Sequence, residues 1–469
     1  MDMDATDIPE LDHDIEAKDK ATIPIKTYRE IIDSDSTPAA DVLALKSNPP
    51  QPTDDIPVEH FISQDFFNLE MEKMWSRVWQ FACRDEHMPE EGDYFVYDIG
   101  RYSILIVRGA DDQLKAYHNS CLHRGTKIKP SGSSGYAAKL QCPFHGWTWE
   151  LDGTLNEVPC SWEFPHLDYE ANRLPEVQVE SWNSFIFINM DLEAPPLLDY
   201  LEVVPEHFEN WRFETWYTYQ HVQKELNCNW KVALEGFMEA YHTPLVHPEM
   251  THVVGDWNMQ HDVFGDHTSR DLCPLGVSSP TSTLGLTEQE LADRMLLGDP
   301  ESHEDGVPVP EGKTARIVMA EQMRQKFAQD YDMDLSGLSD AECIDSLKYN
   351  IFPNMILYGG PGLPQIQLFK PHGMDPDKCI MENFNFRPCP PGEVRPDPAE
   401  PYRIKEEESF TTVPGTNEFS GSVLDQDTSI MRWQQEGMHA SKKAAQTLSR
   451  YQESRIRRIH ETLVKYIEG

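Results

Sequence analysis

Two pairs of potential metal ligands stand out in the first half of the chain. Cys121 and His123 are separated by one residue, and Cys142 and His145 are separated by two. Thiolates and imidazoles bind both zinc and iron, and each pair is close enough in sequence to lie on one tight loop. Two such loops, brought together by the fold, would supply four ligands to one metal centre.

The make-up of this ligand set favours one kind of centre over another. Two Cys and two His bind a [2Fe-2S] cluster of the Rieske type, in which Cys residues hold one iron and His residues hold the other. Neutral imidazoles reduce the negative charge on the cluster, so its potential rises and it accepts electrons readily. A structural zinc site uses the same donors, but zinc fingers more often pair Cys with Cys and His with His. We therefore predict the iron–sulfur cluster.

A second set of possible ligands follows further along the chain. A helical pattern runs from Trp230 to Tyr241, and Glu239 and His242 would share one face of such a helix because they are three residues apart. His247 would point about 140° away from His242 in an unbroken helix. Pro244 disfavours an unbroken helix, and a break there would let both imidazoles converge on one ion.

A carboxylate would complete this second centre. Two His and one carboxylate form the facial triad of non-haem Fe(II) oxygenases, which leaves coordination positions open for O2. The carboxylate has to come from a distant part of the chain. We predict Asp427, at the start of an expected C-terminal helix, with Asp425 as the alternative. An ordinary helix-capping acid is the competing interpretation for both residues.

Strand patterns surround the Cys/His loops. Residues 94–109 predict two strands joined at Asp98–Gly100, and residues 148–158 predict a hairpin that turns at Asp152–Gly153. The apolar run from Ser184 to Met190 would close a small all-β domain. The loops that carry the cluster ligands would therefore lie at the tips of this domain.

The second half of the chain predicts an α+β domain, with an antiparallel sheet covered by helices. Helical patterns at 198–213 and 230–241 come first, strands follow at 350–359, 363–371 and 379–388, and residues 427–467 form one long helix or two. Residues 277–312 are rich in Ser, Pro, Gly and acid, with a capping box at Thr287 and Glu290. This insertion is either part of a lid or a plain surface excursion.

The length of 469 residues is enough for two domains with buried cores. The expected order along the chain is a mobile acidic arm at 1–52, a helical lead-in packing on the catalytic domain at 53–90, the β-domain at 91–192 and the catalytic domain at 193–469.

The charge and the apolar pattern exclude several classes of partner. The formal net charge of -40 argues against nucleic acid and anionic membranes, which need a basic surface. No apolar run approaches the roughly 20 residues that span a bilayer, and the acidic N-terminus does not resemble a secretory signal. Nine cysteines at irregular spacing fit a reducing compartment. We therefore expect a cytoplasmic protein.

With both metal motifs in this order, the chain resembles the α-subunits of Rieske non-haem iron ring-hydroxylating oxygenases from about residue 60 onward. The resemblance implies that a reductase, often with a ferredoxin, passes electrons from NAD(P)H to a [2Fe-2S] cluster. From there they reach a mononuclear Fe(II). It assigns the cluster ligands as Cys121, His123, Cys142 and His145. It assigns the Fe(II) ligands as His242, His247 and Asp427.

The resemblance also implies a head-to-tail trimer. In this arrangement Glu239 would bridge His242 of its own subunit and His145 of the next, where most family members have Asp. Related enzymes built from α-subunits alone share the E-x-F-x-E-x-Y-H pattern seen here, so α3 is favoured over α3β3.

The expected function is hydroxylation of a small aromatic or similarly apolar compound with O2, by dihydroxylation or monohydroxylation, in aromatic compound catabolism. There are two alternatives. The first is an oxidative demethylase or amine monooxygenase, and the second is an electron-transfer protein without a catalytic iron. Several apolar residues are candidates to line a substrate pocket, with core packing as the competing role. They are Phe237, Met238, Leu245, Val246, Phe352, Met355 and Phe369.

Overall fold

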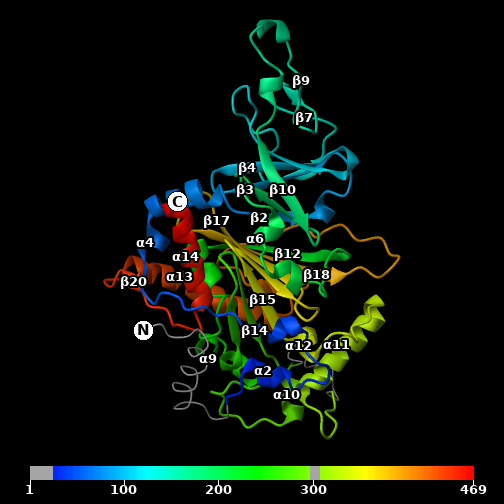
Figure 1. Ribbon diagram of the computed structural model, residues 1–469, viewed down its shortest axis with the longest axis vertical. Coiled ribbons are helices and arrows are strands. Elements are labelled where there is room, and N and C mark those ends of the chain that lie inside the picture. Colours follow the sequence, from blue (N-terminus) through cyan, green and yellow to red (C-terminus); the bar gives the residue numbers. More distant parts are fainter. Residues whose placement is uncertain (1–24, 296–306) are drawn as a thin grey trace. The chain divides into compact units, whose positions relative to one another are not determined.

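The computed structural model describes residues 25–295 and 307–469, which form two compact units (Figure 1). The β unit contains Gln64–Leu201 together with two short segments, Pro371–Asp375 and Lys465–Gly469. The α+β unit contains residues 25–63 together with the described residues of Glu202–Lys370 and Pro376–Val464.

The β unit is built on a seven-stranded sheet, as its strand patterns predict. A smaller three-stranded sheet of β7 (Leu140–Gln141), β8 (Thr148–Trp149) and β9 (Leu155–Glu157) adjoins the ligand loops. The order of the large sheet is β2 (Gln80–Arg84), β11 (Phe185–Asn189), β10 (Glu176–Trp182), β5 (Leu114–His118), β4 (Tyr102–Arg108), β3 (Asp93–Ile99) and β6 (Ser134–Tyr136).

The two predicted hairpins of the β unit are present. β3 and β4 pair antiparallel around a turn in which Gly100 has φ +52°. β8 and β9 pair antiparallel around Gly153, which has φ +82°. A side chain at position 153 would also meet the ring of Tyr117 at 2.6 Å, so only glycine fits this turn.

The α+β unit contains an eight-stranded sheet that is antiparallel apart from one pair. β19 runs parallel to β12, after the Pro-rich loop at 389–401, because a long connection can return the chain in the same direction. The strand order is β13 (Gln260–Val263), β14 (Thr268–Cys273), β15 (Ser346–Ile351), β16 (Met355–Gly359), β17 (Gln365–Pro371), β18 (Cys379–Pro388), β12 (Trp216–Leu226) and β19 (Tyr402–Ile404).

Helices flank this sheet, and Figure 1 shows α13 and α14 on one side of the strands and α11 on the other. The C-terminal region forms two helices, α13 (Glu418–His439) and α14 (Ser454–Glu468), with strand β20 (Ala445–Gln446) between them. α11 covers Ala315–Tyr331. None of the helices in the described ranges is long and apolar enough to cross a membrane.

The described part of the N-terminal arm differs from expectation. Residues 1–24 lie outside the described residues, but 25–52 pack on the α+β unit through α2 (Tyr28–Ile32) and α3 (Asp41–Ala44). Leu43 is fully buried, and Arg316 forms ion pairs with Asp35 at 3.2 Å and Asp345 at 2.6 Å. Apolar burial and these ion pairs anchor the segment, so it is not a mobile arm.

The lead-in region is divided between the two units. α4 (Glu59–Ile62) belongs to the α+β unit, whereas α5 (Gln64–Leu69) and a π-helical turn, η1 (Glu70–Trp75), belong to the β unit. The helix ends at Trp75, and β2 follows with all of its residues buried. The predicted helical region includes the residues of β2, because a short buried apolar run is compatible with either a helix or a strand.

Candidate metal centres

The two ligand loops of the β unit share one backbone pattern. In the first, the Cys121 N–H donates to the carbonyl of Thr126 at 2.8 Å, and the Gly125 N–H donates to the carbonyl of Cys121 at 2.8 Å. Gly125 has φ +79°, which favours glycine. The second loop repeats the pattern with Cys142, Trp147 and Gly146 at 2.8 and 3.2 Å. Both loops therefore present a Cys and a His from equivalent turns.

The ligand side chains of the two loops meet in pairs, His123 with His145 and Cys121 with Cys142. The rings of His123 and His145 are 4.7 Å apart between centroids, and His123 also stacks on Trp147 at 5.1 Å. Burial raises the pKa of the Cys121 thiol, and the neighbouring Cys142 thiol raises it further. Two adjacent thiolates therefore need a cation to stabilise them.

An unpaired atom supports a metal in this place. Nδ1 of His123 is buried and has no hydrogen-bond partner among the residues the structure describes. A buried polar atom without a partner costs free energy unless a ligand satisfies it. Two buried thiols and two imidazoles, one of them unpaired, fit the ligand set of a Rieske [2Fe-2S] cluster.

The second centre is built differently from the sequence expectation. α8 (Trp230–Glu235) ends before Glu239, so Glu239 and His242 do not share a helix. His242 and His247 flank the short helix α9 (Thr243–Val246) at its two ends. Pro244 lies in the first turn of α9, where a missing N–H is tolerated, so it begins a helix instead of breaking one.

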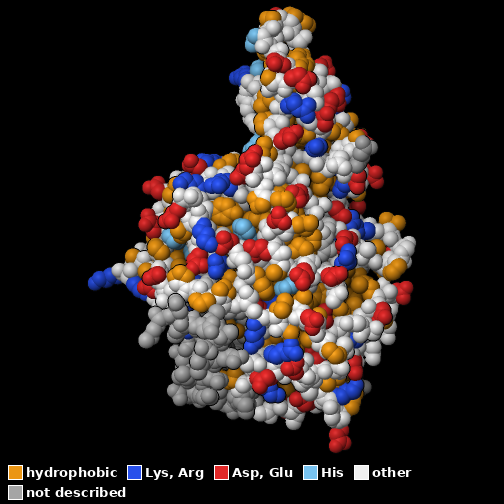
Figure 2. Space-filling model, viewed as in Figure 1, with side chains coloured by type: hydrophobic (Ala, Val, Ile, Leu, Met, Phe, Trp, Pro, Cys, Tyr) orange, Lys and Arg blue, Asp and Glu red, His pale blue; other side chains and the backbone are white. Residues whose placement is uncertain are grey.

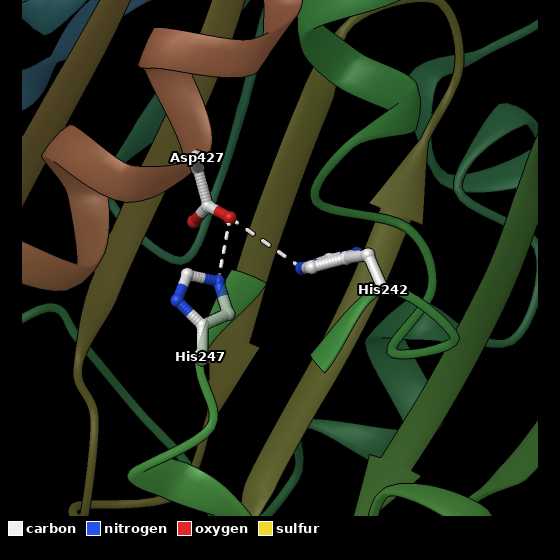
Figure 3. Close-up of side chains that lie close together, drawn as sticks. All are labelled: His242, His247 and Asp427. Carbon is white, nitrogen blue, oxygen red and sulfur yellow. Dashed lines mark hydrogen bonds and ion pairs between the residues drawn. The ribbon is translucent and has the colours of Figure 1, made fainter. Parts of the chain in front are cut away.

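Asp427 joins the two histidines from α13 (Figure 3). Its Oδ1 is 2.7 Å from Nε2 of His247 and 3.4 Å from Nε2 of His242. One ligand atom from each of the three residues lies within 4.8 Å of the others. This donor set, two imidazoles and one carboxylate, fits a mononuclear Fe(II) with open positions.

Asp427 lies in the interior of α13, because the helix begins at Glu418 with Asn417 as its cap. The helix-capping role is therefore excluded for both acids. Asp425 is directed elsewhere: its Oδ1 lies 3.3 Å from Nζ of Lys224 and accepts from the Phe410 N–H at 3.0 Å. The structure thus brings Asp427, and not Asp425, to the histidines.

Each imidazole is held on its outer side by a second group. Nδ1 of His242 lies 2.6 Å from Oε1 of Glu239, and Nδ1 of His247 lies 2.7 Å from Oε1 of Gln426. Gln426 in turn donates to Glu249 at 2.9 Å. Such contacts fix each ring so that Nε2 points toward Asp427, where a metal would bind. Gln426 is not among the predicted site residues, because only its position next to Asp427 in the sequence indicates a role at this site.

The electrostatics of the site suit a cation. Burial works to lower the pKa of His242, but Asp427 and Glu239 outweigh it and raise the pKa to about 10. Burial works to raise the pKa of Asp427, yet the two histidines lower it overall. Positive charge between these groups is therefore stabilised, and a divalent ion can take the place of protons.

A cavity of about 560 Å³ opens onto this centre. Among the apolar candidates only Phe237 lines it. Met238, Phe352, Met355 and Phe369 are core residues, and Leu245 is exposed. The wall is mainly apolar, and amide and hydroxyl side chains are set into it from Gln220, Ser346, Gln365, Gln367, Asn383, Asn385 and Asn417.

The described part of the insertion contributes to this cavity. α10 (Glu288–Met295) begins at the predicted capping box, where the Thr287 N–H donates to Glu290 at 2.8 Å and the Glu290 N–H donates to Thr287 at 3.3 Å. Arg294 and Met295, at the end of α10, line the cavity. Residues 296–306 of the insertion lie outside the described residues.

Two family models match the chain. The ring hydroxylating alpha subunit (catalytic domain) matches residues 208–469, and the Rieske [2Fe-2S] domain matches residues 78–172. The chain therefore belongs to the family of ring hydroxylating alpha subunits, and its cofactors are a Rieske [2Fe-2S] cluster and a mononuclear iron.

Individual relatives point to a narrower group. The chain is 30% identical over 207 residues to the glycine betaine monooxygenase oxygenase subunit of Pseudomonas aeruginosa, covering 43% of this chain and 47% of that protein. It is 28% identical over 233 residues to the carnitine monooxygenase oxygenase subunit of Escherichia coli, covering 45% and 60%. The chain thus spans about half the length of the curated relatives it matches.

Solved structures share the fold. Naphthalene 1,2-dioxygenase from Rhodococcus sp. aligns with a TM-score of 0.59 at 19% identity, over 88% of this chain and 94% of that one. At this level of identity the similarity establishes the architecture, a Rieske β-domain followed by an α+β catalytic domain.

Proposed function

We propose that this chain is the terminal oxygenase component of a Rieske system and hydroxylates a small polar organic substrate. The single observation that carries the proposal is the His242, His247 and Asp427 triad at the wall of the 560 Å³ cavity. When bound, the two metal groups supply electron transfer and O2 activation. Cys121, His123, Cys142 and His145 would hold the cluster, and the triad would hold Fe(II).

A methylated amine is the favoured substrate class, in place of an aromatic hydrocarbon. The similarity to the glycine betaine and carnitine monooxygenase oxygenase subunits supports this choice. The amide side chains set into the otherwise apolar wall support it as well, because a hydrocarbon would leave the buried Asn383 oxygen unpaired. Oxygen insertion at an N-methyl C–H bond needs O2, two electrons and two protons, and it releases one water.

We propose a reductase, with or without a ferredoxin, as electron donor, and a trimer as the working assembly. The position of His145 supports the trimer: this cluster ligand is exposed at the tip of the β unit, next to Phe144, which is 57% exposed. An exposed ligand can contact the Glu239 of a neighbouring subunit. Sedimentation analysis of the holoprotein tests the trimer, and a monomer would exclude this arrangement.

Iron analysis and product analysis test the activity. The holoprotein should contain about three irons per chain, whereas an electron carrier without a catalytic centre would contain about two. With a reductase, NADH and O2, a trimethylammonium substrate should yield formaldehyde or a hydroxylated product. An aromatic acid and an aromatic hydrocarbon serve as comparison substrates. Turnover of the hydrocarbon alone would contradict the methylated-amine assignment.

A further inference from the structure

The sheet floor of the cavity carries a row of four polar side chains. This polar row consists of Lys348 on β15, Tyr358 on β16, Gln367 on β17 and Asn383 on β18, and all four line the cavity. The four strands are consecutive neighbours in the sheet, and Lys348 pairs directly with Tyr358. Hydrogen-bonding groups therefore extend across the floor in one line.

The Lys348 ammonium group belongs to a buried ion group with an excess of positive charge. Oδ2 of Asp271 lies 3.4 Å from Nζ of Lys348 and also contacts Arg455. Asp271 and Arg455 are fully buried, whereas Lys348 reaches the cavity. Because one carboxylate is shared between two cations, a net positive charge remains at the cavity wall.

The other charged groups of the wall do not cancel this charge. The two carboxylates that line the cavity are Glu239 and Asp427, and both are engaged with His242 at the iron site. Arg294 adds a second cation from α10. Among the described lining residues, the wall away from the iron site therefore has cations and no carboxylate. Figure 2 shows acidic and basic side chains interspersed over the outer face of this chain of net charge -40, whereas this part of the cavity wall carries cations alone.

Two amides of the polar row are prepared for a ligand. Oδ1 of Asn383 is buried, and the described residues offer it no hydrogen-bond partner. Asn383 is 3% exposed, so solvent does not satisfy it. Oε1 of Gln367 accepts from the Tyr358 hydroxyl at 3.0 Å, which orients the Gln367 amide and leaves its N–H groups to donate. A ligand carboxylate could accept from the Gln367 N–H groups, whereas the Asn383 oxygen requires a donor on the ligand.

We propose that Lys348 is a specificity-determining residue that binds a carboxylate of the substrate, with the Gln367 amide N–H as a neutral donor beside it. This inference rests on the proposed function, since it concerns the same cavity. The substrate carboxylate would balance the two cations around Asp271. The opposite end of the substrate, which carries the C–H bond to be hydroxylated, would lie toward the iron site. The chemical class is therefore a carboxylic acid, and with the amine assignment it is a zwitterion.

The test is calorimetric binding to the anaerobic holoenzyme, with three probes of one shape. γ-Butyrobetaine carries a carboxylate and a trimethylammonium group, its methyl ester carries only the ammonium, and 5,5-dimethylhexanoate carries only the carboxylate. Both carboxylates should bind at least about tenfold more tightly than the ester. Equal affinity for all three probes would overturn the inference. If 5,5-dimethylhexanoate binds but γ-butyrobetaine yields no product, the methylated-amine assignment fails and the carboxylate site stands.

Variants localise the carboxylate. Lys348→Met should weaken binding of 5,5-dimethylhexanoate about tenfold or more and leave the ester unchanged, and Lys348→Arg should restore most of the affinity. Arg294→Met is the matched cation control and should lower the affinity for 5,5-dimethylhexanoate less than Lys348→Met does. A larger loss in Arg294→Met than in Lys348→Met would overturn the assignment. The assignment would also be overturned if removal of the mononuclear iron abolished binding of 5,5-dimethylhexanoate while Lys348→Met left it intact. The Rieske visible spectrum reports folding in each variant.

Discussion

Glu239 and His242 form a direct contact, with Oε1 of Glu239 2.6 Å from Nδ1 of the imidazole. The second carboxylate oxygen accepts from the His242 backbone N–H at 3.1 Å. The helix does not place these residues together, because it ends at Glu235. The loop between α8 and α9 wraps the carboxylate around its own histidine instead. Glu239 thus orients the ring whose Nε2 faces Asp427, and it is the proposed connection to the cluster of a neighbouring subunit.

Replacing Glu239 tests that connection. Glu239→Gln should keep both metals but slow oxidation of the reduced cluster in a single turnover by at least about tenfold, because the carboxylate no longer holds the imidazole. Glu239→Asp, the residue most family members have, should recover part of the rate. Stopped-flow absorbance of the cluster measures both. A wild-type rate in Glu239→Gln would show that this residue is not on the electron path.

Asp427 and Asp425 offer a matched pair of variants. Asp427→Asn should reduce the iron content from about three to about two per chain and abolish turnover, because the facial triad loses its carboxylate. Asp425→Asn should retain about three irons, since Asp425 contacts Lys224. The visible spectrum of the cluster should persist in both. Loss of iron from Asp425→Asn alone would reverse the ligand assignment.

Gln426 is expected to tune the iron site through His247. Gln426→Leu removes the acceptor at 2.7 Å from Nδ1 of His247, so the ring loses its fixed orientation. The affinity for Fe(II) should fall about 10–100-fold, with the cluster unaffected. Competition with a calibrated chelator measures the affinity. Gln434→Leu, an exposed position on the same helix, is the control, and an equal effect in both variants would argue against a specific role.

His207 predicts how the stability of the α+β unit depends on pH. Burial and the charge of Arg270 together lower the pKa of His207 to about 4, with burial as the larger cause. Its neighbours are the Tyr349 hydroxyl at 3.0 Å and Arg270, which pairs with Asp262 at 2.7 Å. Between pH 6.5 and about 4 the unfolded chain binds a proton that the folded chain does not bind. The free energy of unfolding should therefore fall as the pH falls, by roughly 3 kcal/mol.

Denaturant unfolding of wild type and His207→Gln at several pH values isolates this contribution. The half-buried His60 and the buried His460 also have lowered pKa values, so the wild type contains their effects as well. The difference in unfolding free energy between wild type and His207→Gln should shrink toward acid pH. Only the wild type has a buried imidazole at this position that resists protonation. A constant difference from pH 7 to pH 4 would contradict the prediction.

Local patterns in the sequence determined the elements whose stability depends on near neighbours. The Cys/His spacings, the hairpins at Gly100 and Gly153 and the capping box at Thr287 are all interactions within a few residues. Strand alternation likewise identified the β-domain and the sheet of the α+β domain. These features follow from backbone geometry and short-range hydrogen bonds, which the order of residues specifies directly.

Tertiary structure alone decided which distant groups meet. Asp425 and Asp427 are about 200° apart around a helix, so only the rotation of α13 against the histidines distinguishes them. The contact of Gln426 with His247, the docking of residues 25–52 and the polar floor beneath Lys348 depend on the same long-range packing. Burial and charge pairing between segments far apart in sequence determine these contacts, and no periodicity within one segment encodes them.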